Sequence, residues 1–248
     1  MMDSQPKLYQ ELAKWWPLVS DPEPYKEEAE FARGILKERK RQPVKTALEL
    51  GCGGGNNASH LKKWMQMTLT DLSAGMVQVS KSLNPECEHH VADMRTLRLG
   101  TIYDAVFIHD ALDYMTSLKD LRSAMVTAHV HLRTGGTAVL VPDYFKETFK
   151  PSTKHGGHDK GKRGLRYLEW TLDEDPKDNR YELHYAFMLR EENGSMHVEL
   201  DRHACGLFPR REWIKTMKSV GFEVETKPDD YRREWLIGTK TTGGRRQP

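Results

Sequence analysis

The chain has 248 residues, a formal net charge of +2 and three cysteines. At this length it can bury about 70 to 75% of its unfolded surface, and one domain with an insertion is expected. The small net charge gives no argument for nucleic acid or an anionic membrane as a partner. Neither a signal peptide nor an apolar run near the roughly 20 residues of a bilayer span is present. Cys52, Cys87 and Cys205 form no disulfide or zinc pattern, so we expect no metal and predict a cytoplasmic protein.

The first 20 residues carry an apolar stripe at helical spacing, with Leu8, Leu12 and Trp15 along it and Tyr9 and Trp16 at its edges. This pattern predicts a helix that packs on the main domain. A second helix is expected after Pro22, because proline is favoured at the first helical position.

The most informative segment is a short apolar strand over residues 46–50 that runs directly into a glycine-rich turn. A strand, a glycine turn and a helix start together make a ligand site. Gly51, Gly53 and Gly55 have the spacing G-x-G-x-G, and Asn56 stands where a dinucleotide-binding motif has its third glycine. This spacing favours S-adenosylmethionine over NAD as the ligand.

Three further strands are expected to end in polar residues. The strand over residues 67–70 ends at Asp71, 20 residues after Gly51, where a pair of ribose hydroxyls would be held. The strand over 89–92 is followed by Asp93, and the strand over 103–108 by His109 and Asp110. Ligands of open α/β sheets bind beyond the carboxyl ends of strands, so these side chains are candidates for ligand contact.

The second half begins with an amphipathic helix and a fifth strand over residues 137–141. Seven Lys or Arg residues then fall within 146–166 among glycines, which predicts a mobile basic loop; such a loop is either merely solvated or closes over an anionic substrate. Alternating apolar runs over 168–172, 181–189 and 196–200, the last two joined at Asn193-Gly194, predict a three-stranded antiparallel meander. A helix over 210–220 and two last strands follow.

The segment Glu49-Leu-Gly-Cys-Gly-Gly-Gly, followed by the ordered acidic strand ends, resembles the first motif of class I S-adenosylmethionine-dependent methyltransferases. The resemblance extends from about Leu8 to Lys240. The meander, followed by the sequence RHACGLFPRREW and later VGFEV, resembles small-molecule N-methyltransferases that act on nucleotide-linked amino sugars or on glycine and sarcosine.

This resemblance implies an α/β fold, a Rossmann-like doubly wound seven-stranded sheet with an antiparallel β meander inserted after strand 5. Residues 1–43 would form an N-terminal helical cap, and 44–143 with 206–240 the cofactor-binding core. Residues 144–205 would be the inserted basic loop and meander, serving as a substrate lid or a dimer surface, and 241–248 a disordered tail.

The resemblance also implies site residues. The N-terminal segment would fold over the cofactor with Tyr9 and Trp16, Asp93 would bond the adenine amino group, and Met94 would cover the ring. The residues expected to bind the cofactor are Glu49, Gly51, Cys52, Gly53, Asp71, Leu72, Met76, Asp93, Met94 and His109.

We therefore predict an S-adenosylmethionine-dependent methyltransferase with a small-molecule acceptor, more at nitrogen than at oxygen. The alternatives are an O-methyltransferase of phenols or carboxylates and a non-catalytic sensor or scaffold that binds the cofactor. We expect no nucleic-acid or membrane partner, and the meander is a candidate surface for a homodimer.

An ammonium or phenol acceptor must lose a proton, so we expect a catalytic base among His109, Asp110 and His203, with Tyr114 orienting the acceptor. Each has a plainer alternative. His109 could contact only the cofactor, Asp110 could cap a helix, and His203 could be a satisfied histidine within the meander.

Overall fold

The computed structural model describes residues 6–38 and 43–241, which contain two sheets. The larger sheet has seven strands in the order β11-β12-β5-β4-β1-β2-β3. The five strands from β5 to β3 are parallel, and β12 is antiparallel to both of its neighbours. The predicted fold class and the antiparallel closing strand are therefore confirmed. The strands are β1 (Thr46–Leu50), β2 (Gln66–Asp71), β3 (Glu88–Val91), β4 (Tyr103–His109), β5 (Leu132–Val141), β11 (Phe222–Pro228) and β12 (Glu234–Lys240).

Helices cover both faces of the larger sheet. One apolar cluster joins β4 and β5 to α5 and α6, and a second joins β1 and β2 to α2 and α3. Because both faces are covered, the central strands β1 and β4 are buried along nearly their whole length. The helices are α2 (Tyr25–Glu38), α3 (Asn56–Leu61), α4 (Ala74–Leu83), α5 (Leu118–His131), α6 (Arg210–Val220) and the 3-10 turn η3 (Ala111–Tyr114).

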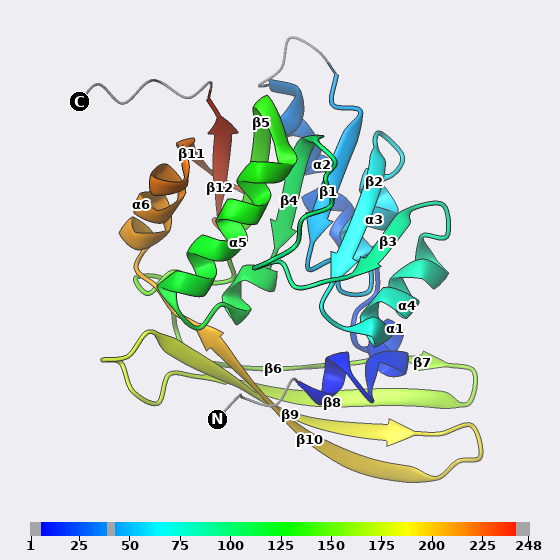
Figure 1. Ribbon diagram of the computed structural model, residues 1–248. Coiled ribbons are helices and arrows are strands. Elements are labelled where there is room, and N and C mark those ends of the chain that lie inside the picture. Colours follow the sequence, from blue (N-terminus) through cyan, green and yellow to red (C-terminus); the bar gives the residue numbers. More distant parts are fainter. Residues whose placement is uncertain (1–5, 39–42, 242–248) are drawn as a thin grey trace.

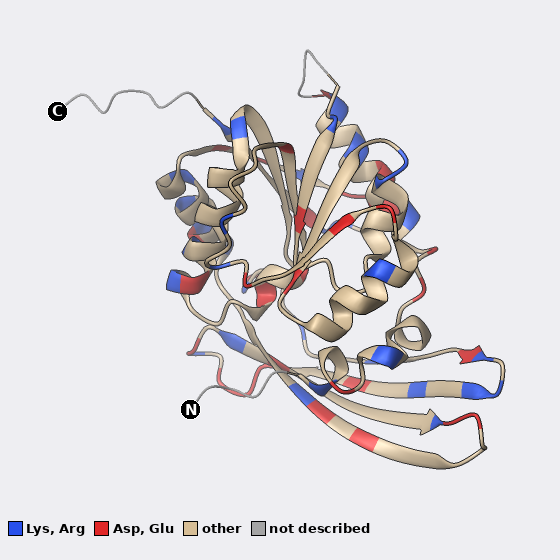
Figure 2. Ribbon diagram, turned by 45° about the vertical axis from the view of Figure 1, so that its right-hand side comes forward, with Lys and Arg blue, Asp and Glu red and all other residues tan. Residues whose placement is uncertain are grey.

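The smaller sheet is the insert between β5 and α6, and it lies across the carboxyl ends of the parallel strands (Figure 1). It has five strands and not the predicted three: β6 (Ser152–Gly156), β7 (Asp159–Lys160), β8 (Arg163–Leu172), β9 (Arg180–Arg190) and β10 (Met196–Gly206). The predicted mobile basic loop was wrong, because the segment forms β6, β7 and the start of β8. Gly157 and Gly161, at φ 111° and 63°, provide turns between these strands. Basic residues gather at the β7–β8 end of this sheet (Figure 2).

The N-terminal segment packs between the two sheets. Its apolar stripe, including Leu8, Leu12 and Trp15, lies against Leu165 and Phe187 on the inner face of the smaller sheet, whereas the sequence led us to expect it on the main domain. The segment is not one continuous helix, however, and consists of η1 (Lys7–Tyr9), η2 (Ala13–Trp15) and the single turn α1 (Trp16–Val19). One reason is Pro17, near the start of α1, which has no N–H with which to continue a helix from the preceding residues.

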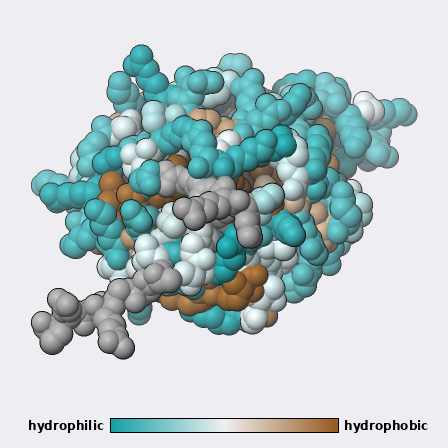
Figure 3. Space-filling view, turned by 90° about the horizontal axis from the view of Figure 1, so that it is seen from above, coloured by the Kyte–Doolittle hydropathy of each residue, from teal (hydrophilic) through white to brown (hydrophobic). Residues whose placement is uncertain are grey.

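Within the described residues, no helix has both the length and the apolar character to cross a membrane. Seen from the end remote from the smaller sheet, the visible surface is mostly hydrophilic with a few hydrophobic patches (Figure 3). The predicted disordered tail lies almost wholly outside the described residues, which end at residue 241.

Candidate active site

The glycine turn joins β1 to α3 and has no room for a side chain at Gly51 or Gly54. Gly51 has φ 72°, and a Cβ on it would lie 2.2 Å from Cβ of Ala111 and 2.8 Å from Cε of Met94. A Cβ on Gly54 would lie 2.2 Å from the Trp16 indole, which covers the turn from the N-terminal segment. The turn is therefore closed in by three separate segments of the chain, and its backbone faces a cavity.

Asp71 holds the turn from the end of β2. Its carboxylate accepts hydrogen bonds from the backbone N–H of Gly53 at 2.8 Å and of Ser73 at 2.9 Å. Burial raises the pKa of Asp71, although these backbone hydrogen bonds oppose the rise. Asp71 therefore couples the position of the glycine turn to the start of α4, which begins after Ser73.

Most of the other residues expected at the cofactor line the cavity, but Met76 does not. Leu72, Asp93 and Met94 line the cavity, as do Gly51, Cys52, Gly53 and Asp71. Asp93 forms an ion pair with Arg95 at 2.6 Å, and this pairing lowers its pKa against the opposing effect of burial. Met76 is fully buried and is not part of the cavity wall. Its methyl group lies beneath the turn, 3.7 Å from where a Cβ on Gly53 would be.

His109 and Asp110 line the cavity within a cluster of charged groups at the end of β4. Both ring nitrogens of His109 face carboxylates: Nε2 is 2.7 Å from Glu28, and Nδ1 is 3.0 Å from Asp110. Arg233 forms a hydrogen-bonded ion pair with Asp110 and lies 3.6 Å from Glu28. Asp110 also has φ 58°, an uncommon conformation for a residue other than glycine. Because these groups are already paired with one another, they are poorly placed to take a proton from an acceptor.

His203 belongs to a different set of contacts, on the smaller sheet. The hydroxyl groups of Tyr9 and Tyr114 lie 2.7 Å apart, and the Tyr114 hydroxyl lies 2.8 Å from Nδ1 of His203. Nε2 of His203 lies 3.0 Å from the Asp201 carboxylate. Tyr9 and Tyr114 line the cavity, whereas His203 is 1% exposed and lies behind them. These four side chains form a hydrogen-bonded tetrad that reaches the cavity only through its tyrosines.

The cavity has a volume of about 880 Å³, within the usual range for small-molecule sites. The glycine turn and the ends of β2 and β4 form one side, the N-terminal segment forms another, and Arg180, Glu182 and Arg202 contribute from β9 and β10. It therefore lies where the two sheets and the N-terminal segment meet, beyond the carboxyl ends of the parallel strands.

Glu49 provides a test of which ligand the cavity fits. It lines the cavity, is 2% exposed, and has an oxygen, Oε2, with no hydrogen-bond partner. Burial, together with the charge of Asp71, raises its pKa to about 8 against the opposing charge of His109. A buried carboxyl group without a partner fits a ligand that brings a positive charge. S-adenosylmethionine carries an ammonium and a sulfonium, and it fits this donor and acceptor set.

Sequence reasoning missed Asp201, Glu28 and Arg233. Asp201 could have been found, because it stands two residues before His203 in an alternating strand and hence on the same face. Glu28 and Arg233 carry no local signal, since they reach His109 from a helix and a turn far away in sequence.

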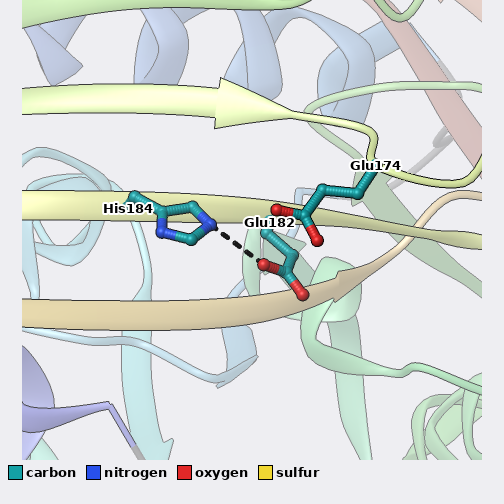
Figure 4. Close-up of side chains that lie close together, drawn as sticks. All are labelled: Glu174, Glu182 and His184. Atoms are coloured by element: carbon teal, nitrogen blue, oxygen red, sulfur yellow. Dashed lines mark hydrogen bonds and ion pairs between the residues drawn. The ribbon is translucent and has the colours of Figure 1, made fainter.

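Glu174 in the turn between β8 and β9 lies close to Glu182 and His184 of β9 (Figure 4). Glu182 already forms ion pairs with Arg202 and, at 2.9 Å, with His184. Its carboxylate is thus engaged by protein groups, and this cluster does not indicate a metal ion.

The fold and the cavity define an α/β protein with a small-molecule site at a glycine turn. Residues 47–136 match the family model described as "Methyltransferase domain". The chain is 26% identical over 207 residues to dTDP-3-amino-3,6-dideoxy-alpha-D-glucopyranose N,N-dimethyltransferase of Streptomyces fradiae, which covers 82% of this chain and 79% of that protein. A dTDP-3-amino-3,4,6-trideoxy-alpha-D-glucopyranose N,N-dimethyltransferase of Streptomyces venezuelae is also 26% identical, with coverage of 75% and 79%.

The fold agrees with solved structures. A sugar N-methyltransferase from a Streptoalloteichus species superposes with a TM-score of 0.83 at 22% identity, over 98% of this chain and 96% of that one. Streptomyces venezuelae DesVI superposes with a TM-score of 0.78 at 23% identity, over 88% and 92%. The chain is an S-adenosylmethionine-dependent methyltransferase, and its cofactor is S-adenosyl-L-methionine.

Proposed function

We propose that this enzyme methylates the amine nitrogen of a sugar carried on a nucleotide. The observation that carries the proposal is the pair of tyrosine hydroxyls, Tyr9 and Tyr114, that face the cavity in front of a buried histidine. Such a group can take up the proton that an ammonium must lose before its nitrogen becomes nucleophilic.

The curated relatives support the acceptor class. The two relatives named above act on amino sugars linked to dTDP, and their similarity covers at least three quarters of this chain. Trans-aconitate 2-methyltransferase of Azoarcus, which is named for a carboxylic acid, matches only 49% of the chain. The longer similarity favours nitrogen as the acceptor atom.

Arg180 supports a nucleotide-linked acceptor, because it lines the cavity from the smaller sheet, whereas Arg202, which also lines the cavity, is held in an ion pair by Glu182. Guanidinium groups bind phosphate oxygens in a planar, bidentate manner. By contrast, Lys160, Lys162 and Arg163 do not line this cavity, and the Arg163 guanidinium lies 4.0 Å from the centre of the Trp15 ring. We therefore assign phosphate contact to Arg180 of β9 and not to the basic segment before it.

The mechanism requires little covalent help from the protein. When bound, S-adenosylmethionine supplies a methyl group to the attacking nitrogen, and the electron pair of the broken carbon–sulfur bond stays on sulfur. The glycine turn, held by Asp71, fixes the cofactor side of the cavity, and Tyr9 with Tyr114 fixes the acceptor nitrogen. Holding two reactants in line in this way can contribute about 7 to 11 kcal/mol in favourable cases. We propose no role in proton transfer for His109 and Asp110.

The test is turnover with matched acceptors. The purified enzyme is incubated with S-adenosylmethionine and dTDP-linked amino sugars, phenols or carboxylic acids, and S-adenosylhomocysteine and product masses are measured. Methylated amino sugar is the expected product. Methylation of only the phenols or acids would contradict the proposal, and cofactor binding without turnover on any acceptor would favour a sensor.

We also propose that the enzyme is a homodimer and acts in the cytoplasm. The outer face of the smaller sheet exposes adjacent apolar side chains, among them Met188 and its strand partner Val198, and Leu168 and Leu200, which flank Ala186. An apolar patch of this kind can be buried against the same patch of a second copy across a two-fold axis. Leu200→Asp should convert a dimer to a monomer in light scattering; a monomeric wild type would contradict the proposal. The three free cysteines support a reducing compartment.

A further inference from the structure

We infer that Asp201 is a positioning residue that gives the Tyr9–Tyr114–His203–Asp201 tetrad its direction and makes its completion depend on docking of the N-terminal segment. The catalytic part of this inference rests on the proposed amine methylation. The docking part concerns only contacts within the chain and can be tested without an acceptor.

The direction follows from which groups can donate. A carboxylate only accepts hydrogen bonds, so the ring nitrogen of His203 that faces Asp201, Nε2, carries a hydrogen. Nδ1 of the neutral ring then has a lone pair and accepts from the hydroxyl of Tyr114. The Tyr114 oxygen in turn accepts from the hydroxyl of Tyr9. The hydrogen atoms of both tyrosine hydroxyls are therefore used within the tetrad. The Tyr9 oxygen presents only lone pairs to the cavity.

An oxygen that only accepts hydrogen bonds suits an ammonium ligand, which can only donate them. The Tyr9 oxygen is therefore a defined partner for the ammonium N–H. As the acceptor proton moves to Tyr9, the Tyr9 proton moves to Tyr114 and the Tyr114 proton to Nδ1 of His203. The acceptor is left with a lone pair and His203 becomes an imidazolium, while Asp201 remains a carboxylate. After product release the proton returns to solvent by the reverse route through the cavity.

The tyrosines pass protons on and do not store them. Burial raises the pKa of Tyr9, and it raises the pKa of Tyr114 well above its ordinary value. A lasting phenolate is thus disfavoured at both positions. The carboxyl of Asp201 behaves in the opposite way: although burial opposes it, the hydrogen bonds from His203 and from backbone amides lower its pKa. Asp201 therefore stays charged and able to hold a protonated His203.

The same carboxylate binds the N-terminal segment. Its Oδ1 accepts from the backbone N–H of Lys7 at 3.0 Å, and its Oδ2 accepts from the backbone N–H of Leu8 at 2.8 Å. The next residue is Tyr9, whose ring forms part of the cavity wall and whose carbonyl accepts a hydrogen bond from Ser73 at the start of α4. Docking of residues 7–9 on Asp201 therefore brings the Tyr9 hydroxyl to Tyr114 in the same step. Until the segment docks, the tetrad lacks its first member.

The experiment combines a double-mutant cycle with hydrogen exchange. Asp201→Asn and His203→Asn are made singly and together, and kcat and KM are measured for the amino-sugar acceptor. Asp201→Asn should lower kcat at least about tenfold, since an oriented base contributes more than this, with KM changed less. The double variant should be no slower than the slower single variant, because Asp201 acts through His203. If the fold-losses in kcat of the two single variants multiply in the double variant, the catalytic part of the inference is overturned.

Glu199→Gln is the matched control. It removes the 2.8 Å ion pair between Glu199 and the Lys7 ammonium, on the same strand and the same segment, but leaves the tetrad intact. Its kcat should equal that of the wild type; a loss equal to that of Asp201→Asn would overturn the assignment to Asp201. Should Asp201→Asn fail to fold, Tyr114→Phe interrupts the tetrad and takes its place in the cycle with His203→Asn.

Hydrogen exchange tests docking without turnover. Amides of the peptide around Lys7 and Leu8 should exchange faster in Asp201→Asn than in the wild type, with exchange in β1 unchanged. Unchanged exchange at these amides would overturn the docking part. If the wild type binds S-adenosylmethionine, methylates no amine and still shows this difference, the proposed function fails while the docking role of Asp201 stands.

Discussion

Replacing Asp71 by asparagine tests the cofactor side of the cavity most directly. Asp71 accepts two backbone hydrogen bonds, from Gly53 in the glycine turn and from Ser73 before α4. Asparagine has the same size but only one accepting atom. Its NH₂ group would face the backbone N–H of either Gly53 or Ser73. At least one hydrogen bond is then lost, and two hydrogen-bond donors point at each other.

A hydrogen bond to a charged group contributes about 1.5 to 3 kcal/mol. If the turn moves as a result, S-adenosylmethionine should bind roughly 10 to 150 times more weakly, because each 1.4 kcal/mol is a factor of ten. Calorimetric titration of the wild type and Asp71→Asn with S-adenosylmethionine and S-adenosylhomocysteine measures this difference, and thermal unfolding shows whether the variant is folded.

Asp104→Asn is the matched control. Asp104 also accepts two backbone hydrogen bonds, from Lys45 and Thr46, but at the opposite end of β1 and outside the cavity wall. It should lower stability without changing the dissociation constant. Equal weakening by both variants, or unchanged binding by Asp71→Asn, would refute the argument that Asp71 sets the geometry of the turn.

Three further predictions concern single groups. Burial raises the pKa of Glu49 from its ordinary 4.5 to about 8, so Glu49 binds a proton on folding and the free energy of unfolding should fall as the pH rises between these values; Glu49→Gln should remove this slope in urea titrations at several pH values. Gly51→Ala should cost about 1 to 3 kcal/mol from overpacking alone, beyond the cost of Gly100→Ala, which has φ 73° but nothing within 4 Å of a Cβ; equal melting temperatures would contradict the clash. Arg233→Met leaves Glu28 and Asp110 with only His109, among the described residues, as a shared partner and should cost about 1 to 3 kcal/mol in chemical denaturation, and a stability equal to that of the wild type would show that solvent already screens them.

The sequence was most informative where local pattern and fold coincide. The strand before Gly51, the acidic residue Asp71 at the end of the next strand and the helix–strand alternation follow from short-range periodicity, and the structure confirms all three. The N-terminal stripe was correct as a pattern but not as a helix, because its packing on the smaller sheet, and not helix periodicity, determines its path.

The acceptor side could be predicted only in part. His203 was a candidate base because of its chemistry, but its burial behind Tyr114 depends on how the smaller sheet lies against η3. The pairing of His109 with Glu28 and Arg233 depends on segments more than 80 positions away along the chain. Contacts of this kind are determined by tertiary packing, and one sequence carries no local trace of them.

The division of the cavity wall between two sheets has an evolutionary consequence. Residues at the ends of β1, β2 and β4 line the side of the cavity where we propose that the cofactor binds, while Arg180, Glu182 and Arg202 reach the cavity from an insert that contributes no strand to the larger sheet. Substitutions in β9 and β10 can therefore change which acceptor is taken without disturbing the methyl donor. A library that seeks a new acceptor for this enzyme should be confined to the cavity-facing positions of these two strands.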